Sequence, residues 1–212
     1  MKHTSKIIIY LVCCFTVVAA LSNRASHLRA AIRQESIAKE VIRLHVLANS
    51  DDKEDQALKI KVKDAIVDYL QHELGETHSV AHARREILQR EEELIRLASQ
   101  VIAQEGYSYP VSMQLGQSYF PEKTYGDLTF PEGTYEALQI KIGAAKGKNW
   151  WCVLFPTLCF VDESTAVVPD SSKEILKETL TLEEYNSLLN NPDVTVSYRL
   201  GIWEDIKKKL SH

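Results

Sequence analysis

His45 is the residue whose surroundings in the sequence come closest to an acid–base site. It precedes an acidic turn that contains Asp51, Asp52 and Asp55, and an imidazole beside carboxylates can act as a general base or as a binding contact. The alternative is a polar histidine on a sheet face, bonded to a neighbouring side chain. We favour this alternative over catalysis, because no nucleophile or oxyanion-stabilising group accompanies His45 in the sequence.

Cys152 and Cys159 are the two cysteines outside the N-terminal apolar segment. Cys152 could in principle be a nucleophile, but Trp151 and Val153 flank it, and apolar surroundings raise the pKa of a thiol and make it inert. A disulfide and two buried thiols both remain open. A disulfide requires Cα atoms within about 7 Å, whereas seven positions of extended strand span roughly 20 Å or more. The chain would therefore have to reverse, most simply at residues 156–157.

Three further patterns each lack something that their chemistry needs. Residues 116–120 (GQSYF) resemble a nucleophile elbow, but Phe120 stands where the sharp turn requires a second glycine. Residues 143–148 (GAAKGK) resemble a phosphate loop, but they are one residue short and lead into a strand, not into a helix N-terminus. His78 and His82 have the spacing of a metal pair without an obvious third ligand. We predict no metal and no cofactor.

Residues 1–21 have the composition of an export signal. Lys2 and Lys6 precede an apolar run, residues 7–21, which is shorter than the roughly twenty residues of a spanning helix and fits the core of a signal peptide. An uncleaved anchor with both lysines inside is the alternative. In either case we expect the rest of the chain to be exported, with a possible membrane tether through residues 7–21 and a helical stalk at residues 22–39.

The charge of the exported part excludes one class of partner. Residues 1–20 hold two lysines and no acid, so the remainder has 23 basic and 29 acidic side chains and a net charge of −6. A nucleic-acid-binding protein would show a basic surplus, so we predict no nucleic-acid partner. About 190 residues suit one core. We place that core at residues 40–161, followed by a C-terminal extension at residues 162–212.

The first part of the core predicts a strand followed by a helix. Residues 41–47 alternate between apolar and polar side chains, which is typical of a strand with Arg43 and His45 on its outward, polar face. Asp51 and Glu54 form a capping box, so we expect a helix to begin there.

The rest of the core changes from helical to strand periodicity. Beyond a second helix at residues 80–105, the pattern predicts strands and their connections: strands at 111–115 and 138–142, a turn-rich link at 120–133 and a hairpin loop at 143–149. The apolar residues of segment 150–160 do not alternate, which is typical of a central strand covered on both faces. We predict an α+β fold, in which a long helix pair covers one face of a mostly antiparallel sheet.

The C-terminal extension differs in character from the core. Residues 173–190 predict one or two short helices, residues 194–200 an edge strand and residues 202–210 a terminal helix. The extension is either an appendage on the core or a partner-binding segment.

Two long motifs in this chain resemble one family. The first combines IRLHVLANSD at residues 42–51 with DQALKIKVKDA at residues 55–65. The second combines TFPEGTYEAL at residues 129–138 with GKNWWCVLFPTLCF at residues 147–160. Together they resemble the stage II sporulation protein R family of endospore-forming bacteria.

The resemblance implies a signalling role. Members of this family are made in the forespore and secreted into the space between the two membranes around it. There they activate a membrane-embedded aspartic protease of the mother-cell membrane, which removes the pro-sequence of a sigma factor, pro-sigma-E. The implied partner is that protease, and no catalytic residue is expected in this chain.

We expect the contact surface where residues 43–64 approach the loop before Trp150. The candidate partner-binding residues are therefore Arg43, His45, Asn49, Asp51, Lys148 and Trp150. The alternative for Asn49 and Asp51 is that they build the turn and cap the helix, and for Trp150 that it fills the core. An alternative of another class is an exported hydrolase of cell wall or peptide that uses His45 and the nearby aspartates.

Overall fold

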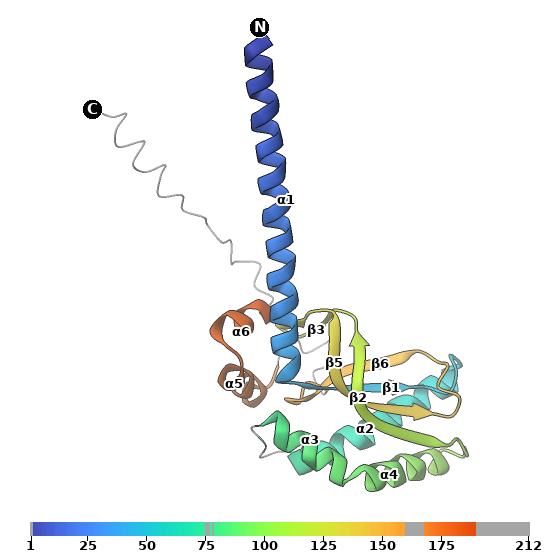
Figure 1. The fold of residues 1–212 in the computed structure, drawn as a ribbon. Coiled ribbons are helices and arrows are strands. Elements are labelled where there is room, and N and C mark those ends of the chain that lie inside the picture. Colours follow the sequence, from blue (N-terminus) through green and yellow to red (C-terminus); the bar gives the residue numbers. More distant parts are fainter. Residues whose placement is uncertain (1, 75–76, 78, 160–167, 190–212) are drawn as a thin grey trace.

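A computed structural model of the chain describes residues 2–74, 77, 79–159 and 168–189, with side chains from Tyr10 onward (Figure 1). The elements follow one another as α1 Lys2–Lys39, β1 Ile42–Leu47, α2 Lys53–Leu74, α3 Val80–Gln89, α4 Glu91–Gln104, β2 Val111–Phe120, β3 Lys123–Tyr125, β4 Leu128–Phe130, β5 Gly133–Ile142, β6 Asn149–Phe155, α5 Asp170–Thr179 and α6 Leu182–Leu188.

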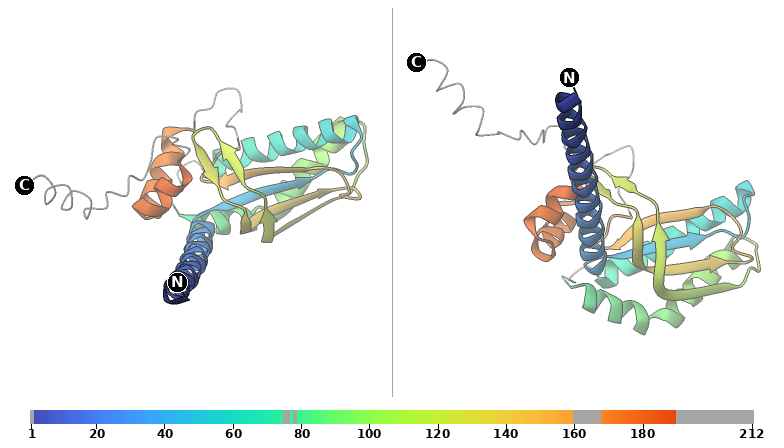
Figure 2. Two further views of the ribbon diagram at one scale, coloured as in Figure 1. Left: turned by 90° about the horizontal axis from the view of Figure 1, so that it is seen from above. Right: turned by 45° about the horizontal axis from the view of Figure 1, so that its top comes forward.

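The expected signal and stalk form one continuous helix, α1, which rises away from the domain (Figure 2). Within the described residues, the segment Tyr10–Lys39 is long and apolar enough to span a membrane, a criterion that an N-terminal signal sequence also meets. The C-terminal end of α1 belongs to the folded domain: Ile37 is fully buried, and the Gln34 side chain donates a hydrogen bond to the Thr134 carbonyl at 3.2 Å.

The main sheet has the strand order β2-β5-β1-β6. β2–β5 and β1–β6 are antiparallel, whereas β1 and β5 are parallel, so the sheet is mixed. The prediction that residues 150–160 form the central strand is wrong, because β6 lies at the end of the sheet and β1 lies inside it. The predicted hairpin loop at residues 143–149 is also wrong: β1 separates β5 from β6, so the link crosses the end of β1.

Figure 1 places α2, α3 and α4 on one side of this sheet. The expected second helix of residues 80–105 is two helices, because the backbone departs from helical geometry at Arg90 (φ −104°, ψ 10°). The three helices bury apolar side chains in the same core as the strands. They meet the face of β1 that carries Ile42, Leu44 and Val46, all fully buried.

The opposite face of the sheet is partly covered by a second layer that the sequence pattern did not predict. Within the turn-rich link, β3 and β4 form a two-stranded antiparallel sheet of their own. Its aromatic side chains Tyr125 and Phe130 are buried, together with Phe120 from β2 and Tyr135 from β5. This small aromatic core lies beside the end of α1 and determines the environment of Arg43.

The C-terminal helices α5 and α6 pack onto the domain. Of the one or two short helices expected at residues 173–190, two are observed, and Thr181 caps α6 in a reciprocal capping box with Glu184. Leu176 and Tyr185 join the common core, and Lys173 is paired with Asp127 of the β3–β4 turn at 2.8 Å. The predicted strand at residues 194–200 and helix at residues 202–210 lie outside the described residues.

Replacing Ile37 by Ala should lower the free energy of unfolding by about 2–5 kcal/mol, because it removes a fully buried side chain at the end of α1. Urea unfolding of the wild-type and variant chains provides the measurement. The matched control is Ile32→Ala on the same helix, where the side chain is 59% exposed and the change should stay within about 0.5 kcal/mol. Equal effects at the two positions would show that α1 does not belong to the domain.

Candidate functional site

Hydrogen bonds join the turn after β1 (residues 48–52) to the link between β5 and β6 (residues 143–148). The backbone N–H groups of Lys146 and Gly147 donate hydrogen bonds to the carbonyls of Asn49 (3.2 Å) and Ala48 (3.0 Å). The Asn49 side-chain oxygen accepts a hydrogen bond from Ala144 N at 2.9 Å. These contacts arise because the link crosses the end of β1, and they bring together two of the motifs that the sequence analysis singled out.

Asp51 and Asn49 are anchored in this junction. The Asp51 carboxylate accepts a hydrogen bond from the backbone N–H of Lys148 at 2.6 Å. Asp51 therefore joins the link to the turn, instead of serving in the predicted capping box with Glu54. The Asn49 side-chain NH₂ donates to the Asp55 carboxylate at 2.8 Å. Burial raises the pKa of Asp55, but hydrogen bonds from Ser50, Asn49 and Tyr109 outweigh it, and the pKa lies below its usual value.

Two glycines make the close approach possible. A Cβ atom on Gly147 would lie 2.0 Å from the Ser50 carbonyl oxygen, and one on Gly143 would lie 2.3 Å from the Asn49 side-chain oxygen. Gly143 also has a φ of +58°, a region that favours glycine. The glycines that first resembled a phosphate loop are therefore required by backbone packing.

Lys59 ties α2 to the same link. Its ammonium group donates to the Gln56 side chain at 2.7 Å and to the Lys148 carbonyl at 3.0 Å. Burial lowers the pKa of Lys59, Asp51 opposes this effect and the Lys148 charge adds to it. Sequence reasoning missed this residue, although its spacing of four from Lys63 on a helix is a signal that both face the same neighbour.

Trp150 faces α2. Lys63 is ion-paired with Asp64, and its ammonium nitrogen lies 4.8 Å from the centre of the Trp150 ring, within cation–π range. Trp150 is half-buried, and its ring N–H is buried without a hydrogen-bond partner among the described residues. The side chain thus packs between the sheet and α2, which is nearer to the core-filling alternative than to a free contact.

His45 lies on the other face of the sheet, where it is 8% exposed. Its ring stacks on Trp151 with 3.8 Å between centres, and its Nδ1 lies 3.3 Å from the Ser118 hydroxyl. Burial lowers the pKa of His45, the Asn149 side chain opposes the shift and the charge of Lys141 adds to it. Within the described structure no aspartate contacts His45, so the carboxylate partner that a general base would need is not supplied by the acidic turn.

The prediction that Arg43 lies on an outward, polar face is wrong. Arg43 is fully buried, and its guanidinium carbon lies 4.2 Å from the ring centre of Phe120 and 4.8 Å from that of Tyr135. One terminal nitrogen donates to the Tyr125 hydroxyl at 2.9 Å, while Nε and Nη1 have no hydrogen-bond partner among the described residues. The second layer of strands β3 and β4 covers this face, and alternation along one strand could not reveal it.

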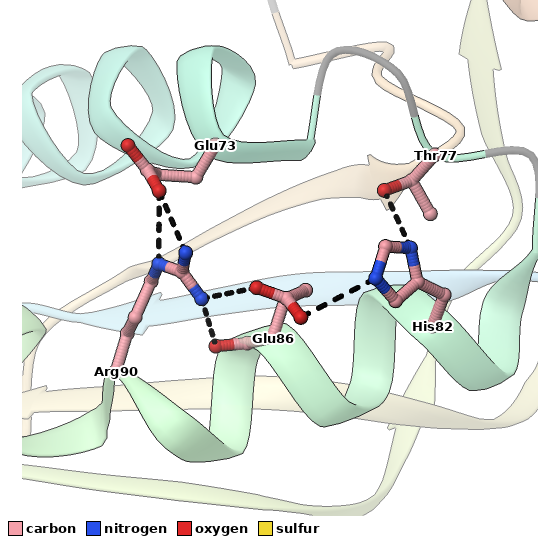
Figure 3. A network of polar contacts seen from close by, with 5 residues as sticks. All are labelled: Glu73, Thr77, His82, Glu86 and Arg90. Atoms are coloured by element: carbon pink, nitrogen blue, oxygen red, sulfur yellow. Dashed lines mark hydrogen bonds and ion pairs between the residues drawn. The ribbon is translucent and has the colours of Figure 1, made fainter.

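The helix histidine His82 belongs to a structural network (Figure 3). It lies 3.2 Å from the Thr77 hydroxyl and 3.3 Å from the Glu86 carboxylate, and Glu86 is in turn paired with Arg90, which also binds Glu73 of α2. The network holds α2 against the bend between α3 and α4. His78 lies outside the described residues, within which no cluster of three potential metal ligands occurs.

Cys152 and Cys159 are bonded in this structure, with 5.1 Å between their Cα atoms. The chain reverses at residues 156–157, where the sequence analysis required it. The bond joins β6 to the segment that follows it. Both residues are buried, so the pair is part of the core and not a reactive thiol site.

The candidate residues do not form one surface. Asn49, Asp51 and Lys148 lie together at the junction of turn and link. Trp150 points to α2 and His45 to the opposite face, beside Trp151, which sequence reasoning did not select. Among the candidate residues, only Asp51 and Lys148 are charged, exposed and close to each other.

Replacing Gly147 by Ala should lower the free energy of unfolding by about 2 kcal/mol or more, because the added Cβ collides with the Ser50 carbonyl in a junction that cannot move apart without losing its hydrogen bonds. Gly116→Ala is the control: its Cβ would meet only the Gln114 side chain at 3.5 Å, and the change should stay within about 1 kcal/mol. Denaturant unfolding of both variants tests this, and equal stabilities would refute the close packing.

Replacing His45 by Gln should remove a pH-dependent loss of stability. The pKa of His45 in the folded protein lies below the usual 6.5, so as the pH falls below about 6.5 the unfolded chain takes up a proton before the folded protein does. The wild type should therefore lose stability relative to the variant between about pH 6.5 and the folded pKa, and the difference should be constant above that window. Urea unfolding of both proteins across this range measures it, and a constant difference throughout would contradict the burial effect.

Comparison with known proteins places these features in a family. The profile of the family described as stage II sporulation protein R matches residues 38–165. The chain is 35% identical over 144 residues to the stage II sporulation protein R of Bacillus subtilis (strain 168), an alignment that covers 67% of this chain and 64% of that relative. The alignment thus spans slightly less than two thirds of the relative's length. No solved structure matches the chain.

Proposed function

Because this chain belongs to the stage II sporulation protein R family, we propose that it is an exported sporulation signal that activates a membrane-embedded aspartic protease of the mother cell. Activation leads to processing of pro-sigma-E, and the chain itself acts as a ligand without a peptidase site. The observation that carries the proposal is the family match over residues 38–165, which extends from the end of α1 past β6.

Two structural features support export into the space between forespore and mother cell. The apolar helix α1 is suited to a signal peptide or an anchor. The Cys152–Cys159 disulfide fits a compartment in which such bonds persist. An anchored α1 would keep the signal at the membrane in which it was inserted, close to the opposing membrane that contains the protease.

The contact with the protease is made by the junction between turn and link, which we call the loop surface and define as residues 49–52 and 144–149. Asp51, Asp52, Lys146 and Lys148 are exposed on it, so it presents charges of both signs at fixed positions. Such patterns select and orient a partner more than they add affinity. Binding activates the protease if the loop surface has a higher affinity for its active state than for its inactive state.

The other candidate residues position this surface. Asn49 fastens the turn to the link through its side-chain amide. Trp150 and its neighbour Lys63 hold β6 against α2. Arg43 cannot touch a partner because it is fully buried, and it acts by fixing the aromatic layer on β1, on which His45 also packs.

Co-expression in a non-sporulating host tests the function itself. Cells that produce this chain, the membrane protease and pro-sigma-E should show processed sigma factor on an immunoblot, and cells without this chain should not. Absence of processing, together with cell-wall hydrolysis by the purified chain, would overturn the proposal in favour of an exported hydrolase.

Lys148→Glu should reduce processing in that assay by roughly tenfold or more, because it reverses an exposed charge on the loop surface. The backbone hydrogen bonds of Lys148 to Asp51 and Lys59 do not involve its side chain, so the variant should fold, and the free energy of unfolding should change by no more than about 0.5 kcal/mol. Arg96→Glu, which makes the same reversal on the exposed part of α4, is the control and should process normally. Equal activity of the two variants would exclude the loop surface as the contact.

A further inference from the structure

The edge strand β2 lacks the features with which proteins protect a sheet edge. Among the described strands it pairs only with β5, in an uninterrupted register from Val111↔Ile142 to Phe120↔Gly133. Its ten residues, VSMQLGQSYF, contain no charge and no proline, although a quarter of the whole chain is charged. Edge strands usually carry lysine, proline or a bulge, because a long, regular and uncharged edge pairs with other chains.

The opposite edge of the sheet is different. In β6 the residues from Cys152 to Phe155 are buried, and only Asn149 is exposed. The strand is also tied down by the disulfide at Cys152 and by the contact of Trp150 with Lys63. The unprotected character is therefore particular to β2.

Exposed apolar side chains gather at the same edge. Apart from the projecting helix α1, the described residues expose three large hydrophobic side chains, and two of them lie here: Tyr119 of β2, 59% exposed, and Leu88 of α3, 51% exposed. Leu88 also borders a small, largely enclosed hollow that Met113 and Leu115 of β2 line. An added strand would bury this apolar surface as well as pairing its backbone.

The chemistry of β2 fits a second copy of itself. Two identical charged edges would repel each other, whereas this edge carries uncharged polar and apolar side chains that are compatible with their own kind. An antiparallel pairing of two β2 strands is related by a two-fold axis perpendicular to the sheet, which keeps the helices of both copies on one side. The Leu88 side chains of the two copies then lie on the same side of the joint.

We propose that β2 is a dimerisation edge, at which two copies of this chain pair their β2 strands antiparallel to form one continuous eight-stranded sheet. The dimer presents two loop surfaces in a fixed, two-fold arrangement. A ligand of this kind engages two copies of a receptor at once, and the second contact is then made at a high effective concentration. The dimer itself does not depend on the proposed sporulation role, and its test needs no protease.

The mass of the full chain in detergent tests the proposal. Sedimentation with correction for bound detergent should give twice the 24.1 kDa of one chain at micromolar concentration. The double variant Gln114→Lys/Gln117→Lys adds charges at two exposed positions of β2 and should weaken dimerisation by roughly tenfold or more. The proposal is overturned if the wild type stays monomeric. It is also overturned if the lysine variant stays dimeric, which is the result expected if α1 made the contact.

Charge exchange sharpens the test. The variant Gln114→Glu/Gln117→Glu should also be monomeric, while an equimolar mixture of the lysine and glutamate variants should dimerise again, because attraction between the two strands then replaces the repulsion between like charges. Gln71→Lys/Asn186→Lys, at two exposed positions on α2 and α6, controls for net charge and should remain dimeric. Failure of the mixture to dimerise, or a monomeric control, would show that net charge and not pairing at β2 determines the mass.

Discussion

The fold requires both faces of β1 to be covered, including the face that carries the Arg43 guanidinium. Arg43 is fully buried, and removing a charge from water costs several kcal/mol even after relaxation. Its compensation is one hydrogen bond to Tyr125 and the faces of the surrounding aromatic rings, each worth about 2 kcal/mol when desolvated. The guanidinium is therefore tolerated only while the β3–β4 hairpin and the rings of Phe120 and Tyr135 stay in place.

The central position of β1 also determines how its neighbouring strands are connected. β1 lies between a parallel neighbour, β5, and an antiparallel neighbour, β6. The chain must pass from β5 to β6 over the end of β1, and the short link does so only by packing its backbone onto the Asn49 turn, with glycine where Cβ atoms would collide. The loop surface, which we propose as the contact with the protease, is thus a direct consequence of inserting β1 into the sheet.

The molecule separates its polar groups by role. His45, Lys59 and Asp55 are buried and bonded within the domain. Burial lowers the pKa of His45 and of Lys59, whereas hydrogen bonds lower the pKa of Asp55 against the effect of burial. Within the described structure, none of these three residues lies in an arrangement of nucleophile, general base and anion-stabilising hydrogen-bond donors. Displaced pKa values mark functional sites only when such a combination accompanies them. Here they accompany packing within the domain.

The sequence by itself determined the family, the mixed α and β composition and the N-terminal apolar helix. These follow from local periodicity and from two long motifs. The tertiary structure decided which strands are central, that Arg43 is buried and that β2 is an open edge. Alternation along a strand reports which side chains share a face, but not what covers that face. Coverage depends on the distant β3–β4 hairpin and on the crossing over β1, which no local pattern encodes.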